Sequence, residues 1–189
     1  MAILVLPFVL ALAAAPSAPF AVPSPATPAA RSALAAPSHV EEGIVDAPID
    51  EVWKVWSTPE GWRISGVAKA DLDFRPGGLI RTHYREDGVL GDDGTIENRI
   101  LAYEPPRMLA IQIARPPATF PFKNAWKEPW TVITLTELAD GRTRVRVASV
   151  GFGADEESQT MLGFFEKGNR WTLDKIRQHF AERHGAPSP

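Results

Sequence analysis

The sequence predicts an α+β domain in which a curved antiparallel sheet of about seven strands wraps around one long C-terminal helix. Three observations predict it: segments that alternate apolar and polar residues, turn dipeptides between those segments, and an apolar helical period near the C-terminus. The connections between the strand segments are too short for parallel crossovers, so the strands must be antiparallel. The chain has 189 residues, enough for one domain and an extension.

Composition excludes several classes of function. The formal net charge is −3, which argues against electrostatic binding of nucleic acid. The chain has no cysteine, so disulfides, thiolate metal sites and cysteine nucleophiles are excluded. His179 and His184 are five residues apart and do not share a helical face, so we expect neither a metal nor a cofactor.

The N-terminal segment is predicted to lie outside the domain. Residues 1–21 contain an apolar run that is shorter than a membrane span of about 20 residues and is typical of a signal peptide. Residues 22–38, rich in Ala and Pro, are expected to form an extended linker, and residues 185–189 a tail. We expect an exported protein, periplasmic or secreted, without stable membrane insertion after processing. If residues 1–21 are not a signal peptide, the protein is instead expected to be cytoplasmic.

Within the domain, residues 39–184, the elements follow one another closely. A strand at residues 39–46 is followed by a helix that starts after Ala47-Pro48, where Asp50 and Glu51 favour a helix N-terminus. A second short helix begins at Glu60. Six strands are then expected near residues 67–74, 79–86, 95–103, 108–114, 130–138 and 143–150. Turn residues separate them, as in Asp87-Gly88 and Asp140-Gly141.

Alternation along the strands predicts one apolar and one solvated face of the sheet. Thr143, Val145, Val147 and Ser149 share the inner face, whereas Arg142, Arg144 and Arg146 share the outer face. By the same rule Tyr84 points inward, and His83 is expected on the solvated face.

The last helix is expected to begin after Asp155 as its N-cap and to end before Gly185, about 28 residues and about 42 Å long. Its apolar stripes are interrupted by Gly168 and Asn169, which are poor fillers of the space beneath the sheet. This interruption predicts a cavity between sheet and helix. The alternative is that Phe165 and Trp171 fill the gap and leave a solid core.

Several segments resemble one known family. They are Ala47-Pro48-Ile49-Asp50-Glu51-Val52-Trp53, Thr58-Pro59-Glu60, Phe74-Arg75-Pro76-Gly77-Gly78, Tyr103-Glu104-Pro105-Pro106-Arg107, Asp140-Gly141-Arg142-Thr143-Arg144 and Gly151-Phe152-Gly153. Together they are similar to the START-like, helix-grip (SRPBCC) superfamily, in its branch of homologues of the activator of the 90-kDa heat-shock protein ATPase. The resemblance covers about residues 39–184 and implies a pocket between the sheet and the C-terminal helix. It specifies no catalytic residue.

The expected function is non-catalytic binding of a small hydrophobic or amphipathic molecule in that pocket. The candidate lining residues are Trp62, Tyr84, Ile111, Ile133, Val147, Ser149, Phe165, Asn169 and Thr172. Phe120, Phe122 and Trp126, in a proline-rich loop, are interpreted either as a lid or as part of the core rim.

Two other functions stay open at this point. One is a polyketide cyclase- or dehydratase-like enzyme in the same cavity, for which Tyr84 is the one inward-facing acid or base. The other is a protein-interaction domain, akin to the chaperone activator, that uses Arg142, Arg144 and Arg146. Such an arginine row is more often a solvated sheet face.

Overall fold

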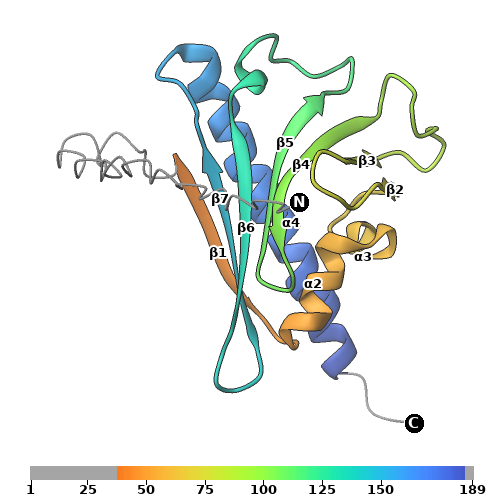
Figure 1. Ribbon diagram of the computed structural model, residues 1–189, viewed down its shortest axis with the longest axis vertical. Coiled ribbons are helices and arrows are strands. Elements are labelled where there is room, and N and C mark those ends of the chain that lie inside the picture. Colours follow the sequence, from red (N-terminus) through yellow and green to blue (C-terminus); the bar gives the residue numbers. More distant parts are fainter. Residues whose placement is uncertain (1–37, 186–189) are drawn as a thin grey trace, which may run out of the picture. The chain divides into compact units, whose positions relative to one another are not determined.

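The computed structural model describes residues 38–185, which form a seven-stranded antiparallel sheet that curves around a long helix (Figure 1). The strands are β1 (His39–Val45), β2 (Lys69–Leu72), β3 (Leu79–His83), β4 (Ile96–Glu104), β5 (Met108–Arg115), β6 (Trp130–Glu137) and β7 (Thr143–Val150). The helices are α2 (Ile49–Ser57), α3 (Pro59–Ile64), the 3-10 turn η1 (Ala125–Lys127) and α4 (Glu156–Gly185). The predicted fold class is confirmed. The expected signal peptide, nearly all of the linker and the residues after Gly185 lie outside the described part of the chain.

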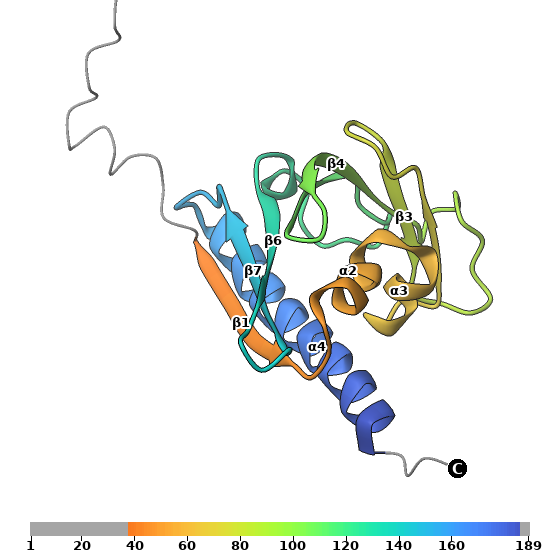
Figure 2. The same cartoon turned by 60° about the horizontal axis from the view of Figure 1, so that its bottom comes forward.

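The strand order is β1-β7-β6-β5-β4-β3-β2, so only the β1–β7 pair joins strands far apart in sequence. Helices α2 and α3 fill the connection from β1 to β2 and lie at the end of the sheet where the C-terminal part of α4 passes (Figure 2). Among the helices, α4 lies nearest to β1, and it also contacts β7 and α3. The space between α4 and strands β3 to β6 is bounded by the sheet, by α4, and by helices α2 and α3.

Local sequence explains the two short helices. In α2 the residues facing the core recur at helical spacing, and Asp50 and Glu51 lie in its first turn. Helix α3 begins with Pro59, and the N–H of Gly61 donates to Thr58 Oγ1 at 3.0 Å. A Cβ on Gly61 would lie 2.0 Å from the Lys54 carbonyl oxygen, so only glycine allows the two helices to pack this closely.

The two faces of the sheet follow the predicted alternation in β7. Thr143, Val145, Val147 and Ser149 are buried, whereas Arg144 is exposed. Arg144 Nε lies 3.2 Å from a carboxylate oxygen of Glu42 on β1, so this outer-face charge is paired with a neighbouring strand.

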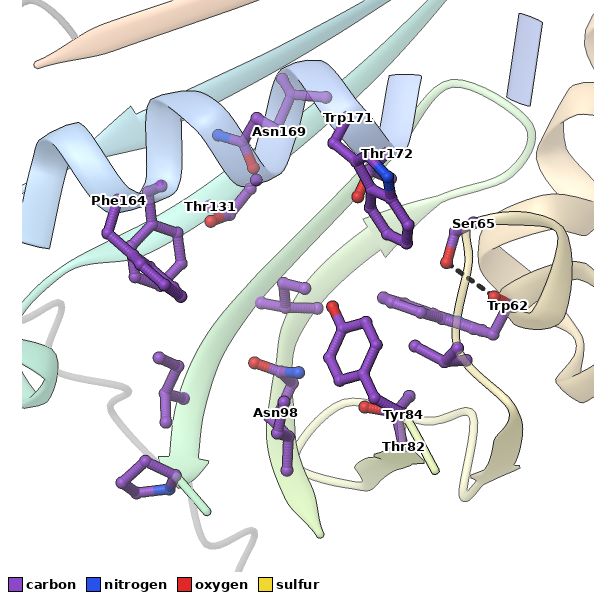
Figure 3. Close-up of a pocket in the computed structure, with 18 of the residues that line it drawn as sticks. Trp62, Ser65, Thr82, Tyr84, Asn98, Thr131, Phe164, Asn169, Trp171 and Thr172 are labelled. Carbon is purple, nitrogen blue, oxygen red and sulfur yellow. Dashed lines mark hydrogen bonds between the residues drawn. The ribbon is translucent and has the colours of Figure 1, made fainter. Parts of the chain in front are cut away.

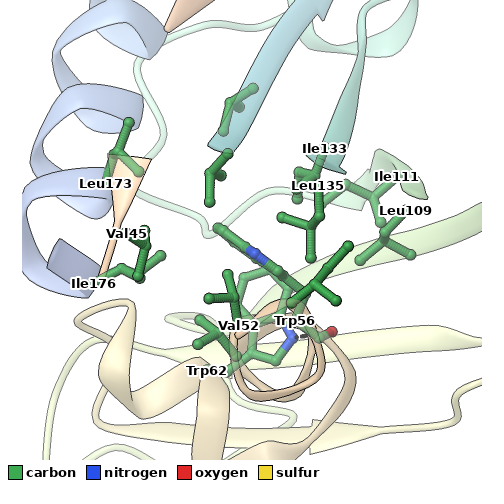
Figure 4. Close-up of a cluster of buried hydrophobic side chains, with 14 of the residues drawn as sticks. Val45, Val52, Trp56, Trp62, Leu109, Ile111, Ile133, Leu135, Leu173 and Ile176 are labelled. Carbon is green, nitrogen blue, oxygen red and sulfur yellow. Dashed lines mark hydrogen bonds between the residues drawn. The ribbon is translucent and has the colours of Figure 1, made fainter. Parts of the chain in front are cut away.

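The main hydrophobic core lies where α2, α3 and the C-terminal part of α4 meet the sheet (Figure 4). Trp56 and Trp62 form its base with ring centroids 5.6 Å apart, and Ile176 and Phe180 close it from α4. A second, smaller cluster of Phe122, Ala125 and Met161 lies beside the N-terminal part of α4. The two clusters leave the middle of the sheet–helix gap open.

Helix α4 begins as predicted. The backbone N–H of Ser158 donates to Asp155 Oδ1 at 3.0 Å, and the Ser158 hydroxyl donates to Asp155 Oδ2 at 2.6 Å. The helix has 30 residues and alternates buried apolar residues with many charged ones. Within residues 38–185, no helix has the length and hydropathy required to cross a membrane.

The prediction for His83 is wrong. Only 3% of its surface is exposed, and the loop between β3 and β4 folds over the ring. The N–H of Arg85 donates to His83 Nδ1 at 2.9 Å, and His83 Nε2 lies 3.2 Å from a carboxylate oxygen of Asp92. Alternation placed the residue on the outer face correctly, but it did not reveal that a loop covers this position.

Candidate functional site

A cavity of about 480 Å³ lies between the sheet and α4 (Figure 3). This volume lies within the range of about 300–1,000 Å³ that small-molecule sites occupy. Strands β3 to β7 supply one wall, α4 supplies the opposite wall, and α2, α3 and the loop after β5 close the ends. The cavity therefore occupies the gap that the two hydrophobic clusters leave.

The innermost walls are apolar and rigid. Trp56, Trp62, Ile133, Val147 and Leu173 are each at most 8% exposed, and each lines the cavity. They come from α2, α3, β6, β7 and α4, so every side of the inner end is built from packed secondary structure rather than from a loop. Such an end offers a preformed apolar contact surface.

Polar groups of the wall are hydroxyls and amides, and none of the described lining residues is Asp, Glu, Lys, Arg or His. These polar lining residues are Ser65, Thr82, Tyr84, Asn98, Thr119, Thr131, Asn169 and Thr172. Figure 3 shows Asn169 and Thr172 on α4 facing Asn98 and Tyr84 across the cavity. The wall is thus uncharged but able to form hydrogen bonds.

Two of these polar groups already have partners within the protein. The Ser65 hydroxyl donates to the Trp62 carbonyl oxygen at 2.6 Å, and Asn169 Nδ2 donates to Ser149 Oγ at 3.2 Å. This bond uses the amide nitrogen of Asn169, so the side-chain carbonyl oxygen takes no part in it. The bond also fixes the Asn169 amide between β7 and α4.

Tyr84 is the one lining residue with a titratable side chain among those described. The residue is 56% exposed in total, yet Figure 3 shows its hydroxyl directed into the cavity. Burial there raises the pKa of the Tyr84 hydroxyl above its ordinary value. The phenol is therefore protonated at neutral pH and serves as a neutral hydrogen-bonding group.

Aromatic residues mark the mouth of the cavity, and Tyr84, Phe164 and Trp171 among them are exposed. The Tyr84 and Trp171 rings lie 6.4 Å apart, and the Phe120 and Phe164 rings lie 6.0 Å apart. Each pair joins a loop to α4, and Gly168 lies between the two pairs on the helix. A Cβ on Gly168 would have no atom within 4 Å, so the mouth is open at this point.

A model of the protein family described as Activator of Hsp90 ATPase homolog 1-like protein matches residues 46–181. The chain belongs to this family. The match includes every strand from β2 to β7, helices α2 and α3, and most of α4. The predicted resemblance is confirmed.

Solved structures with the same fold agree with the family assignment. Protein MLL2253 from Mesorhizobium loti has a TM-score of 0.60 at 19% identity, covering 78% of this chain and 98% of its own. CalU16 from Micromonospora echinospora has a TM-score of 0.55 at 22% identity, covering 79% and 76%. The Aha1 dimer from Colwellia psychrerythraea has a TM-score of 0.56 at 12% identity, covering 75% and 93%. No curated protein matches the sequence significantly. At these identities the likeness shows the fold, which includes ligand-binding and cyclase-like members.

The structure brings eight of the nine predicted lining residues to the cavity of this family member. They are Trp62, Tyr84, Ile111, Ile133, Val147, Phe165, Asn169 and Thr172. Ser149 is fully buried behind Asn169 and contacts that amide instead of the cavity. Its hydroxyl thus positions a lining side chain. Whether these residues bind a ligand stays a prediction.

The predicted lid residues separate into two groups. Phe120 lines the cavity, together with Pro116, Pro117 and Pro121 of the same loop. Phe122 belongs to the second hydrophobic cluster, and Trp126 packs against it; neither lines the cavity, whereas Phe120 both lines the cavity and packs against this cluster. The N–H groups of Lys123 and Asn124 both donate to Glu157 on α4, which ties this part of the loop to the helix. Only the first half of the loop therefore faces the cavity.

Sequence reasoning missed several lining residues, although strand alternation could have identified some of them. Thr131 and Asn98 have the same strand parity as the inward-facing Ile133 and Ile100, so alternation alone could have found them. The sequence offers no such signal for Trp56, because a helical apolar period does not distinguish core from cavity wall.

Proposed function

We propose that this protein binds a small, uncharged, largely hydrophobic molecule in the cavity between the sheet and α4, and that it does not transform the molecule. The observation that carries the proposal is a preformed cavity whose described lining is apolar, with hydroxyls and amides but no charged side chain. The family assignment supports it, since the fold includes ligand-binding members.

The chemistry of the wall favours a neutral ligand. Burial of apolar surface stabilises a complex by about 25 cal/mol per Å², and the inner end offers five packed apolar side chains for that contact. A charged group would lose its hydration without meeting an opposite charge, which costs several kcal/mol. Hydroxyls and amides near the mouth can instead orient a neutral polar group.

The same set of lining residues favours binding without catalysis. General acid–base catalysis is most efficient when the pKa of the catalytic group is near the working pH. Tyr84 is the only titratable candidate among the described lining residues, and burial moves its pKa further away from neutrality. This supports a carrier or sensor over the cyclase-like alternative.

The first experiment uses N-phenyl-1-naphthylamine, a neutral dye that fluoresces in apolar sites, together with native mass spectrometry before and after organic extraction. We expect micromolar dye binding in the purified protein, and a small molecule that is lost upon extraction. Gly168→Leu should place a side chain in the open mouth and weaken dye binding by about tenfold or more, which corresponds to about 1.4 kcal/mol.

Gly163→Leu is the matched control. Gly163 is also a glycine of α4 whose Cβ would meet no atom within 4 Å, but it does not line the cavity. The control should bind the dye as the wild-type protein does. Equal loss in both variants, or no bound molecule and no dye binding in the wild type, would refute the proposal.

A further inference from the structure

The side-chain amide of Asn169 presents an unused hydrogen-bond acceptor to the cavity. Its nitrogen donates to Ser149 Oγ at 3.2 Å, whereas its oxygen accepts no hydrogen bond among residues 38–185. Figure 3 shows the oxygen end of this amide pointing away from α4 into the cavity, toward Thr131. The Asn169 oxygen is not among the buried unpaired atoms of the described chain, so a molecule in the cavity can reach it.

Ser149 determines which end of the amide faces the cavity. It is fully buried on β7, and its hydroxyl oxygen is the partner of the Asn169 nitrogen. Because the nitrogen is held against β7, the oxygen is the end that remains for a ligand. An amide oxygen accepts hydrogen bonds and cannot donate them, so this point of the wall is suited to an O–H or N–H group.

The amide lies next to the apolar inner end of the cavity. Along β7, Ser149 is followed toward that end by Val147, which pairs with Ile133 on β6. Along α4, Asn169 is followed by Leu173, four residues further on. Two residues of a strand and four residues of a helix each correspond to about 6–7 Å. A polar layer at Asn169 is therefore followed, one such step deeper, by an apolar layer.

A ligand that covers the Asn169 oxygen without pairing it binds less well. The oxygen loses its access to water, and an acceptor that is left unpaired costs free energy. A donor on the ligand at this place restores the hydrogen bond. Purely hydrocarbon molecules, and molecules whose polar groups only accept, are disfavoured for the same reason.

We infer that Asn169 is a specificity-determining residue whose side-chain oxygen accepts a hydrogen bond from the ligand, and that Ser149 positions it. The inference rests on the proposed function. It narrows the ligand to neutral hydrophobic molecules that carry an O–H or N–H donor, with an apolar body that extends at least about 6–7 Å inward from that donor.

The test compares carbazole with dibenzofuran, two flat, neutral molecules of nearly the same shape. Carbazole has an N–H donor where dibenzofuran has a ring oxygen that can only accept. Displacement of N-phenyl-1-naphthylamine gives the affinity ratio of carbazole to dibenzofuran in each protein. Asn169→Leu replaces the amide with an apolar group of similar size, so we expect this ratio to fall by about three- to tenfold.

Further variants locate the acceptor. Ser149→Ala releases the amide from β7, so the ratio should fall there as well, by a smaller factor. Thr172→Val removes a neighbouring lining hydroxyl on α4 and keeps the shape of the side chain. Gln178→Leu is the matched control, because it exchanges an amide for the same apolar group at an exposed position of α4 that does not line the cavity. The control should leave the ratio unchanged.

A second readout uses the wild-type amide itself. The chain has three asparagines, Asn98, Asn124 and Asn169, and Asn124 does not line the cavity. In protein with ¹³C-labelled asparagine side-chain carbonyls, carbazole should move the Asn169 resonance downfield, and dibenzofuran should not. Asn98→Gln and Asn124→Gln identify the other two resonances by their loss. This keeps the inference testable even if Asn169→Leu does not fold.

The outcomes separate the two proposals. If neither probe nor N-phenyl-1-naphthylamine binds the wild type, the proposed function fails, and the inference fails with it. If the probes bind but the ratio is unchanged or rises in Asn169→Leu, or falls only in Thr172→Val, the inference alone is overturned. An equal response of the Asn169 resonance to both probes also overturns it. An unchanged ratio in Ser149→Ala overturns the positioning role of Ser149.

Discussion

His83 shows how a single residue can organise a loop. The loop between β3 and β4 passes so close to the imidazole that a Cβ on Gly88 would lie 2.0 Å from the ring, and a Cβ on Gly94 would lie 2.4 Å from it. Both positions therefore require glycine because of the histidine, and not because of backbone dihedral angles. The adjacent Tyr84 lines the cavity, so this loop also helps to hold one side of the mouth.

We predict that Gly88→Ala destabilises the protein by about 1–3 kcal/mol, because the added methyl group overlaps the buried ring. His83→Ala in the same chain should recover part of this loss, since it removes the overlapping atoms. Urea unfolding of both single variants and of the double variant gives the coupling energy. Strict additivity of the two single effects would contradict this account.

At the scale of the element, α4 supplies one wall of the cavity and begins after an N-cap residue, Asp155, that stabilises its first turn. Asp155 accepts from the Ser158 hydroxyl and from the Ser158 backbone N–H. These bonds to the charged form, the side-chain bond first, hold the pKa of Asp155 below its ordinary value. Phe164 and Phe165 of the same helix line the cavity, so order at this end of α4 matters to the site.

We predict that Asp155→Ala lowers the melting temperature by about 2–4 °C at neutral pH, through loss of the cap. Because folding lowers this pKa, the stabilisation from Asp155 is complete above the ordinary pKa of a free aspartate. It is lost as the pH falls through the lowered value. Asp155→Asn keeps a capping oxygen at every pH.

Thermal melts between about pH 2 and pH 7 check this prediction. The difference between the wild type and Asp155→Ala should shrink in acid, whereas the difference between Asp155→Asn and Asp155→Ala should not. A constant difference between the wild type and Asp155→Ala across that range would contradict the assigned role.

At the scale of the whole described domain, charge is distributed in a simple way. Ion pairs connect residues of the outer surface, as between Arg81 and Asp71 or between Arg142 and Asp140, whereas the cavity wall has no charged side chain among the described residues. The protein thus separates a charged exterior from a neutral interior site. Selectivity for neutral ligands is the expected result.

We predict that N-phenyl-1-naphthylamine binds at least about tenfold more tightly than its sulfonated relative 1-anilinonaphthalene-8-sulfonate, because the buried sulfonate would find no counter-charge. Binding of the neutral dye should also be unaffected by salt up to about 0.5 M, since no charge pair contributes to it. Fluorescence titrations measure both. Equal affinities for the two dyes, or a steep salt dependence for the neutral one, would contradict a neutral site.

The sequence by itself determined the fold and part of the cavity wall. Alternation assigned faces in β7, turn dipeptides separated the strands, and Asp155 marked the start of α4. Residues such as Ile133 and Val147 were found because strand parity depends only on local geometry, which a sequence specifies directly.

Only the tertiary structure decided which polar groups have partners. It buried His83 beneath a loop, placed Ser149 behind Asn169 and left the buried indole N–H of Trp56 without an acceptor among the described residues. Periodicity cannot reveal these outcomes. Each depends on atoms from segments that are distant in sequence, and on whether a backbone passes close enough to cover a side chain or supply an acceptor.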